Sequence, residues 1–410
     1  MDHERVRING ARLHASLAAL ARVGATAGGG VTRLALSDED RAGRDLLGAW
    51  LADAGLSVRV DDFGTMTGRR AGATDGPAVL LASHIDSVRQ GGRYDGAYGV
   101  LGALEVVRTL NDHGVRTRLP IEVVNWTNEE GVRFEPAMMA SGAVAGRFGR
   151  DETYARTDRD GRRFGDELRR IGYLGDEANR PGPAAAYLEL HIEQGPVLEA
   201  AGLPVGVVDG IVGITWSEVL IEGHADHAGP SPMHLRRDAL AAAAKVVSAV
   251  EEIAREAGAV GTVGRIAAEP NVINTIPGRV VLSVDFRHHE PEALEALVDE
   301  LRERIVDLVA ERGVAITLDR FWTSEPTPFA PPVVAAVESA ADRLGLPSMH
   351  LWSGAGHDAK YAQDLWPSAM VFARSQNGLS HCEDEFSTEG DLEAGANVLL
   401  HATLRLAGLA

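Results

Sequence analysis

Five short stretches of the sequence place side chains that bind metal ions directly after apolar runs. The first is "ASHIDSVRQGGRYDGAYGV" at residues 82–100, which contains His84, Asp86 and Asp95. The other four contain Glu129 and Glu130 in "NWTNEEGVRF", His191 in "YLELHIEQGP", His224 and His227 in "EGHADHAGPSPMHLRRDA", and His381 in "SQNGLSHCEDEFS". One such side chain alone is usually an ordinary surface or core residue. The joint pattern of histidines and acids, flanked by Gly or Pro, predicts a metal site.

The residue types predict a hydrolytic site with two metal ions. Imidazole and carboxylate ligands suit Zn²⁺, Mn²⁺ or Co²⁺, and no thiolate pattern competes with them. Two ions about 3.5–4 Å apart need a bridging carboxylate, and they hold a water whose pKa they lower towards neutrality. A further carboxylate must then accept the proton of that water. The adjacent Glu129 and Glu130 could divide these roles, because neighbours at a strand end point in different directions.

The elements around the first two stretches predict an α/β fold. The apolar runs 78–83 and 121–127 are typical of buried strands, and the residues 97–112 between them have the pattern of a helix. This alternation predicts a mostly parallel sheet with helices on both faces. Ligands bind such sheets at the carboxyl ends of the strands, which is where these metal-binding side chains fall.

The N-terminal residues predict further elements of the same domain. Residues 4–23 have apolar positions at helical spacing, and residues 56–62 alternate like a strand. Ser37 followed by Asp40 resembles a capping box, which opens a helix that Gly55 ends.

A different pattern begins after residue 212. It predicts, in order, a strand at 215–222, an Ala-rich helix at 236–257, strands at 260–267 and 279–287, a helix at 291–312 and a strand at 314–321. This β-α-β-β-α-β order is that of a ferredoxin-like unit. The remaining residues return to helices and buried runs such as "SAMVFA" at 368–373. We therefore expect a discontinuous main domain, 1–212 with 327–410, and a smaller inserted α+β domain, 213–326.

Composition limits the function classes. The 410 residues are 45% hydrophobic, which suits a sizeable core, and the formal charge of −19 argues against a nucleic acid or an anionic membrane surface as partner. Cys382 is the single cysteine, the N-terminus "MDHERVRING" is polar, and no apolar run approaches the ~20 residues of a membrane span. These features predict a cytoplasmic protein.

Seven motifs, taken in order, resemble those of the M20-type metal-dependent amidohydrolases. Within them the similarity is to the branch of N-carbamoyl-L-amino-acid hydrolases, β-ureidopropionases and allantoate amidohydrolases. The motifs run over nearly the whole chain and read "SHIDSVRQGGRYDGAYGV", "NWTNEEGVRF", "LELHIEQGPVLE", "GHADHAGPSPMHLRRDAL", "PNVINTIPG", "SGAGHDA" and "GLSHCEDE".

The resemblance implies two divalent metal ions per subunit and a role for each candidate ligand. The implied set is His84 and His191 on the first ion, Glu130 and His381 on the second, Asp95 bridging both, and Glu129 as general base. Asp86 would orient His84. The resemblance also implies that domain 213–326 serves as a lid and as the dimerisation module of a homodimer.

The resemblance further implies the residues that bind a small substrate with a carboxylate. His227 would reach the site of a neighbouring subunit and steady the oxyanion, although spacing alone does not separate it from His224 and His234. The other implied contacts are Asn274 and Arg287 to the carboxylate, and Gln194, Gly356 and His357 elsewhere on the substrate. From the residues alone, Arg287 can bind a carboxylate through two parallel hydrogen bonds or form an ordinary salt bridge, and Asn274 can be a turn residue.

His191 indicates the reaction. Related M20 peptidases usually have an acid at the matching position, so a histidine there favours the ureido branch, although Glu189 and Glu193 are near enough in sequence to ligate instead. The expected reaction converts an N-carbamoyl-L-amino acid and water to an L-amino acid, CO₂ and ammonia. The alternatives are an allantoate or ureidoglycolate amidohydrolase and, after these, an aminoacylase or dipeptidase. Arg374, Gln376 and Cys382 depart from the family pattern and leave the preferred side chain open; Arg374 could favour an acidic substrate or face solvent.

Other function classes lack their sequence signals. A non-catalytic binding or dimerisation protein would be indicated by loss of Glu129 or of a ligand, and none is missing. A nucleotide enzyme would need a GxGxxG after the first strand or a GK[ST] motif, and a serine hydrolase would need a GxSxG turn. The sequence has none of these.

Overall fold

The computed structural model describes residues 3–410, which divide into two compact units. One unit runs to Gly210 and resumes at Phe329, and the other comprises Ile211–Pro328. The expected inserted domain, 213–326, lies inside the second unit; its role as lid and dimerisation module stays a prediction. In the described residues, no helix is both long and apolar enough to cross a membrane.

The larger unit contains eight strands of a nine-stranded sheet, and the two-residue strand β14 falls within the bounds of the other unit. The order of the sheet is β1-β2-β4-β3-β5-β16-β6-β14, with β15 paired to β6. The strands are β1 (Ser57–Val60), β2 (Met66–Arg70), β3 (Ala78–His84), β4 (Ile121–Trp126), β5 (Ala184–Ile192), β6 (Val205–Ile211), β14 (Thr327–Pro328), β15 (Ser348–Ser353) and β16 (Ser368–Ala373). The central strands β4, β3, β5 and β16 are parallel, while β1, β2 and β6 pair antiparallel. The predicted α/β class with a mostly parallel central sheet is confirmed.

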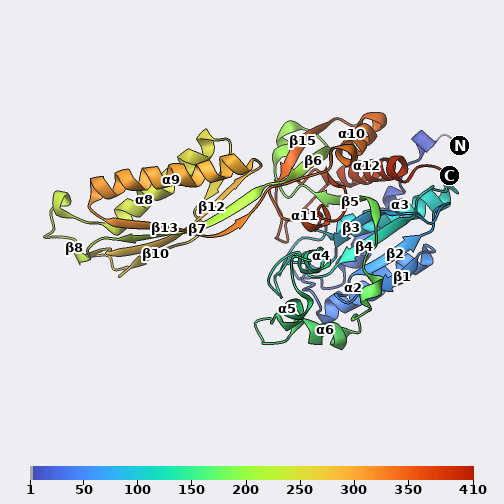
Figure 1. Cartoon of the computed structure of the whole chain (residues 1–410), viewed down its shortest axis with the longest axis horizontal. Coiled ribbons are helices and arrows are strands. Elements are labelled where there is room, and N and C mark those ends of the chain that lie inside the picture. Colours follow the sequence, from blue (N-terminus) through green and yellow to red (C-terminus); the bar gives the residue numbers. More distant parts are fainter. Residues whose placement is uncertain (1–2) are drawn as a thin grey trace. The chain divides into compact units, whose positions relative to one another are not determined.

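Helices lie on both sides of this sheet, with α10 and α12 on one side and α2 on the other (Figure 1). The helical elements are η1 (His3–Arg5), α1 (Gly10–Ala21), α2 (Asp38–Asp53), α3 (Ala97–Asp112), α4 (Met139–Val144), α5 (Arg150–Ala155), α6 (Phe164–Ile171), η2 (Glu177–Asn179), α7 (Val197–Ala201), α10 (Pro331–Leu344), α11 (Ala359–Ala362) and α12 (Glu389–Ala407). The predicted bounds of α3 are confirmed.

Caps decide where the first helices begin. The side chain of Ser37 accepts a hydrogen bond from the Asp40 N–H, so the predicted cap of α2 is confirmed. The helix expected over 4–23 is shorter, because the Asn9 side chain caps α1 by accepting from the Arg12 N–H. Apolar spacing alone did not show this later start.

The second unit has a five-stranded antiparallel sheet in the order β10-β12-β7-β13, with the fifth strand β9 paired to β12, and a separate ribbon of β8 and β11. Its elements are β7 (Gly213–Glu222), β8 (Asp226–His227), η3 (Met233–Leu235), α8 (Ala239–Glu256), β9 (Val260–Thr262), β10 (Ile266–Glu269), β11 (Thr275–Ile276), β12 (Arg279–His288), α9 (Pro291–Arg312) and β13 (Ala315–Ser324). The strand expected at 260–267 is interrupted at residues 263–265, which include Gly264, a residue without a side chain to pack.

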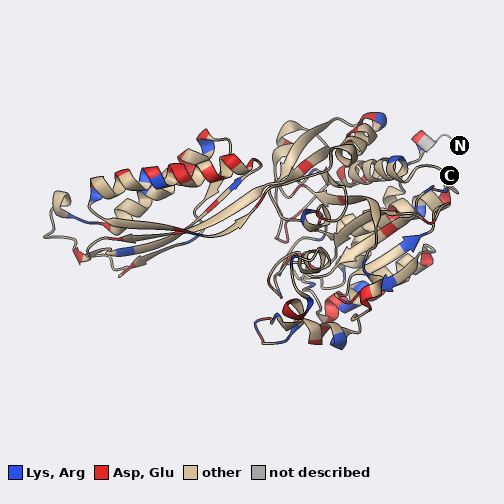
Figure 2. Ribbon diagram, viewed as in Figure 1, with Lys and Arg blue, Asp and Glu red and all other residues tan. Residues whose placement is uncertain are grey.

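Helices α8 and α9 cover one face of this sheet (Figure 1). Leu297, Leu301 and Val246 belong to a buried cluster that also holds Val280 and Phe286 of β12. Acidic and basic residues are interspersed along α9 (Figure 2). The helix is therefore amphipathic and folds by burying one apolar stripe.

Asp61 directly follows β1 and is fully buried in the β1–β2 turn. Its Oδ1 accepts hydrogen bonds from the backbone N–H groups of Phe63 and Thr65, while its buried Oδ2 has no hydrogen-bond partner. Burial raises the pKa of Asp61 to about 7. The folded protein therefore holds the Asp61 proton more tightly than the unfolded chain does.

We predict that Asp61→Asn makes the protein more stable at alkaline pH. A raised pKa in the folded state gives a stabilisation that is complete below the unfolded pKa and is lost as pH rises through the folded pKa. The free energy of unfolding of the variant should therefore gain about 2–3 kcal/mol on the wild type between pH 5 and pH 8. Denaturant unfolding at several pH values measures this, with Asp160→Asn, an exposed acid, as control. A constant difference at all pH values would contradict it.

Candidate active site

The six residues with predicted metal or base roles come together at the carboxyl edge of the parallel strands. They are His84 at the end of β3, Asp95 in the turn before α3, Glu129 and Glu130 three and four residues past β4, His191 near the end of β5, and His381 in the loop after β16. Parallel strands point the same way, so their carboxyl ends meet at one edge of the sheet. The sheet topology therefore explains why residues so distant in sequence are neighbours.

His84, Asp95 and His191 form a first candidate metal-binding group. All three are buried, and one potential ligand atom of each lies within 4.8 Å of the others. His191 Nε2 is 3.0 Å and His84 Nε2 is 3.6 Å from the same oxygen, Asp95 Oδ1. Gly96 makes this approach possible: a Cβ there would lie 2.3 Å from the His84 ring, and its φ of 61° also favours glycine.

Asp95, Glu130 and His381 form a second candidate group with the same mutual limit of 4.8 Å. His381 Nε2 lies 3.2 Å from Asp95 Oδ2 and 3.4 Å from Glu130 Oε2. Asp95 thus offers one oxygen to each group. His381 is the outermost residue of the set, with 53% of its side chain exposed.

The hydrogen bonds of two histidines fix the form of their rings. His84 Nδ1 is 3.0 Å from the Asp86 carbonyl oxygen, and His191 Nδ1 is 2.8 Å from the Ile192 carbonyl oxygen. A carbonyl only accepts, so each Nδ1 carries a hydrogen, and when the ring loses its second proton the Nε2 beside Asp95 is the atom left with a lone pair. This is the tautomer that binds a metal ion through Nε2.

The clustered carboxyl groups of the site need a nearby positive charge to ionise. Burial, with Asp95 next to it, raises the pKa of Glu130 to about 8, and burial raises the pKa of Glu129 well above its ordinary value. The hydrogen bond to Asp95 raises the pKa of His381 to about 9. Burial opposes ionisation of Asp95, but its hydrogen bonds with the three histidines prevail and hold its pKa well below the usual range.

These residues fit divalent metal ions. Glu130 Oε1 is buried without a hydrogen-bond partner, so it has an unused lone pair at the site. Ligand atoms bonded tetrahedrally to zinc at 2.0–2.2 Å lie about 3.3–3.6 Å apart. The contacts among the candidate ligands of the two groups, 3.0–3.6 Å, bracket that spacing.

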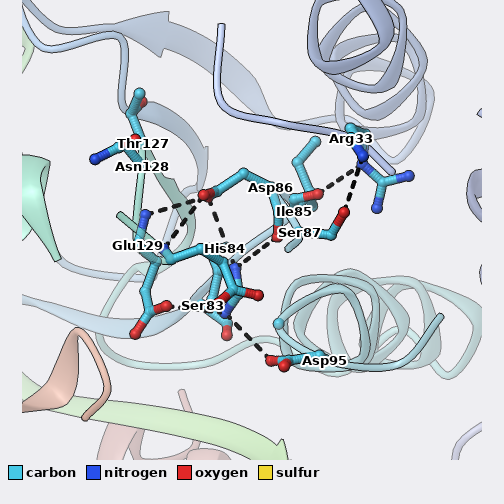
Figure 3. Close-up of polar contacts among 12 residues, drawn as sticks. Arg33, Ser83, His84, Ile85, Asp86, Ser87, Asp95, Thr127, Asn128 and Glu129 are labelled. Carbon is cyan, nitrogen blue, oxygen red and sulfur yellow. Dashed lines mark hydrogen bonds and ion pairs between the residues drawn. The ribbon is translucent and has the colours of Figure 1, made fainter. Parts of the chain in front are cut away.

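Asp86 holds the base and one ligand by their backbone. Its Oδ1 accepts from the Glu129 N–H at 3.2 Å (Figure 3). Its Oδ2 accepts from the Glu130 N–H at 3.3 Å. It orients His84 as expected, but through its carbonyl, since its carboxylate lies 3.7 Å from the ring nitrogen. Arg33 steadies the same turn by donating to the Ile85 carbonyl at 2.6 Å (Figure 3).

Gln194 and His357 lie beside these ligands. Gln194 Nε2 donates to Asp95 Oδ2 at 2.9 Å, and its Oε1 is buried without a partner. The His357 ring lies 4.5 Å from that of His191, and its Nε2 is 3.0 Å from Ser353 Oγ. Gly356 leaves room for Met138, whose Cε would be 3.1 Å from an added Cβ.

The other three predicted substrate residues belong to the unit 211–328. His227 is exposed on β8, where it pairs with Thr275 of β11, and the exposed Asn274 directly precedes that strand. Arg287 lies on β12, and its Nε and Nη2 donate to the two oxygens of Asp285 at 3.1 and 2.8 Å.

The structure answers two questions that the sequence left open. Glu189 accepts from Ser83, Tyr187 and the Ala359 N–H, and Glu193 accepts from two backbone N–H groups, so both have structural partners. In the described part of the chain, neither belongs to a candidate metal group. Arg374 pairs with Asp391 at 3.0 Å, which accounts for its charge within the fold.

Sequence reasoning missed Ser380 and Glu385. Both sit beside Asp95: Ser380 Oγ is 3.4 Å from Asp95 Oδ2, and Glu385 accepts from the Asp95 N–H at 3.1 Å. The only sequence signal was their closeness to His381, in a stretch already rich in acids.

The fold, together with two candidate metal-binding groups that share Asp95, is that of a metal-dependent hydrolase. A model described as Peptidase family M20/M25/M40 matches residues 80–405, and the chain belongs to this family, as its motifs predicted.

Relatives that align over nearly the whole chain support this family assignment. The N-carbamoyl-L-amino-acid amidohydrolases of Rhizobium meliloti and Geobacillus stearothermophilus are 42% and 43% identical; the alignments cover 98% of this chain with each, and 98% and 99% of the two relatives. An allantoate amidohydrolase of Bacillus subtilis is 34% identical over 95% of both chains. The crystal structure of an amidase of the hydantoinase/carbamoylase family from Burkholderia multivorans matches with a TM-score of 0.96, 48% identity and 98% of both chains.

We predict that removing one ligand removes one metal ion from a defined group. Protein stripped of metal and reloaded should bind two ions, His191→Ala or His381→Ala should bind one, and Asp95→Ala should bind neither tightly, because Asp95 serves both groups. Metal content after gel filtration measures this by elemental analysis. His350→Ala is the control, since His350 is paired with Asp209 and Glu338 instead. Two ions retained in Asp95→Ala would contradict the assignment.

Proposed function

We propose that the protein hydrolyses N-carbamoyl-L-amino acids to the L-amino acid, CO₂ and ammonia. The observation that carries this proposal is the first candidate group, in which His191 and not a neighbouring acid faces Asp95. A histidine at this position is the feature that separates the ureido branch from its peptidase relatives in the motif comparison. The names of the relatives from Rhizobium meliloti and Geobacillus stearothermophilus support the same substrate class.

Two divalent ions are part of the proposal, with Zn²⁺, Mn²⁺ and Co²⁺ as candidates. The residues that would hold them are His84, Asp95 and His191 for one, and Asp95, Glu130 and His381 for the other. When bound, the ions supply Lewis-acid polarisation of the carbonyl and activation of a water.

Glu129 is the proposed proton carrier. Its Oε2 lies 3.7 Å from His84 Nε2, and Asp86 holds its backbone, so the carboxylate is fixed beside the candidate ligands without being a member of either group. Burial raises its pKa well above the ordinary value, which favours proton uptake. Glu129 would accept the proton of the attacking water and pass it to the leaving nitrogen.

The remaining predicted residues supply substrate contacts in this proposal. The unpartnered Gln194 Oε1 can accept a hydrogen bond from a carbamoyl N–H, since its Nε2 is already tied to Asp95. Arg287 and Asn274 would bind the substrate carboxylate, and His227 would donate to the developing oxyanion. Gly356 and His357 would line the pocket.

We also propose that the unit 211–328 acts as lid and dimerisation module of a homodimer. Apolar side chains are exposed near its β8–β11 ribbon, where His227 and Asn274 lie: Met233, Leu235, Val272 and Ile273. Exposed apolar patches of this kind mark contact surfaces. The single cysteine supports a cytoplasmic location, which stays a prediction.

An allantoate or ureidoglycolate amidohydrolase is the second candidate. The same ligands and base would serve any linear ureido compound, and the allantoate relative spans the chain. Its lower identity favours the carbamoyl amino acid as substrate. An aminoacylase or dipeptidase activity ranks below both.

We predict metal-dependent ammonia release from a ureido compound. The panel comprises N-carbamoyl-L-amino acids, N-carbamoyl-β-alanine, allantoate, ureidoglycolate, N-acetyl amino acids and dipeptides, with enzyme reloaded with Zn²⁺, Mn²⁺ or Co²⁺. Glu129→Gln should lower kcat about 10²–10⁴-fold because it removes the base, while retaining its metal content. Turnover of acyl or peptide substrates alone would contradict the proposal.

We predict that Arg287→Lys acts mainly on substrate binding. Lys keeps the charge but loses the paired hydrogen bonds, so KM for an N-carbamoyl-L-amino acid should rise about 10–100-fold with a smaller change in kcat. Steady-state kinetics measure both constants. Arg279→Lys, on an exposed position of the same strand, is the matched control. An unchanged KM would remove Arg287 from the substrate site.

A further inference from the structure

Glu385 joins two segments that carry metal-ligand candidates. Its side chain is buried, and its Oε1 accepts hydrogen bonds from the backbone N–H groups of Tyr94 and Asp95 at 3.0 and 3.1 Å. Its Oε2 accepts from Ser380 Oγ at 2.8 Å. One carboxylate therefore binds both the turn that bears Asp95 and the loop that bears His381.

Neighbouring residues are fitted to this arrangement. A Cβ on Gly92 would lie 2.0 Å from the Glu385 carboxyl group, so the glycine leaves the space that the carboxylate fills. Ser380 lies within hydrogen-bonding distance of Asp95 Oδ2 as well as Glu385. Glu385 thus binds the Asp95 backbone directly and accepts the hydroxyl hydrogen of Ser380, the residue before His381.

The two candidate groups depend on this link to different degrees. His84 and His191 lie in or at the ends of buried strands, where the sheet fixes them. His381 lies in a loop, is half-exposed and has a φ of 56°, a backbone conformation that few non-glycine residues adopt. The sheet does not fix this loop. The position of His381 relative to Asp95 therefore needs another restraint.

We infer that Glu385 is a positioning residue that fixes the His381 loop against the Asp95 turn and thereby sets the metal affinity of the Asp95–Glu130–His381 group. The inference rests on the two-ion site of the proposed function. Outer hydrogen-bond partners of metal ligands typically change metal affinity about 10–100-fold when removed. A general contribution to folding would instead weaken both groups alike.

The test is a chelator titration of wild type and Glu385→Ala, each loaded with two equivalents of Zn²⁺. His381→Ala and His191→Ala assign the two release steps to their groups. His381→Ala should abolish one release step. Glu385→Ala should lower the Zn²⁺ affinity of that same step about 10–100-fold and change the affinity of the other step little. Glu385→Gln should restore the affinity, because its amide oxygen still accepts from both backbone N–H groups. Asp384→Ala is the matched control: it removes the same charge from an exposed neighbour.

Each result decides the inference. Two unchanged steps, or equal weakening of both together with a lower melting temperature of the metal-free protein, would overturn it. Should Glu385→Ala fail to fold, Ser380→Ala carries the test, since it removes one bond of the link, and equal effects on both steps would overturn the inference. The titration of the wild type is done first and counts its bound ions. Fewer than two ions would overturn the proposed two-ion site itself, before any variant is compared.

Discussion

Asp95 is the group on which the candidate site depends. It is a buried carboxylate with three imidazole nitrogens within 3.6 Å, and its two oxygens belong to different candidate groups. A buried carboxylate needs partners for its lone pairs and a compensating positive charge for its ionised form. The surrounding structure is built around this requirement: Gly96 allows His84 to approach, Gln194 donates to one oxygen, and Glu385 holds the backbone.

The predictable part of the fold was the part with strong local patterns. The buried runs that became β3, β4 and β16, and the helix α3, have uninterrupted apolar or periodic sequences, so their bounds followed almost directly. The start of α1 did not, because an Asn9 cap overrides apolar residues upstream. The broken strand at 260–267 failed for a similar local reason at Gly264.

The candidate site was predictable where a motif contains side chains whose type alone indicates metal binding. His84, Asp95 and His191 are side chains of distinctive type at strand ends, and the parallel topology then brings them together. Sequence could not show that the Asp86 carbonyl rather than its carboxylate binds His84, since the two acceptors belong to one residue. It also could not single out Glu385 among the acids of "HCEDE", because only the fold buries one of them against Tyr94 and Asp95.

The unequal burial of the two groups has a kinetic consequence. An ion held by His84, Asp95 and His191 would lie among buried side chains, so it should exchange slowly with solvent. An ion on His381 would border solvent, because half of that side chain is exposed. The lifetimes of the two ions would differ, with the outer one exchanging first. In purified protein, the ion at the His84–His191 group would then be the one bound when the protein was made. The ion at the His381 group would depend on the buffers used in purification.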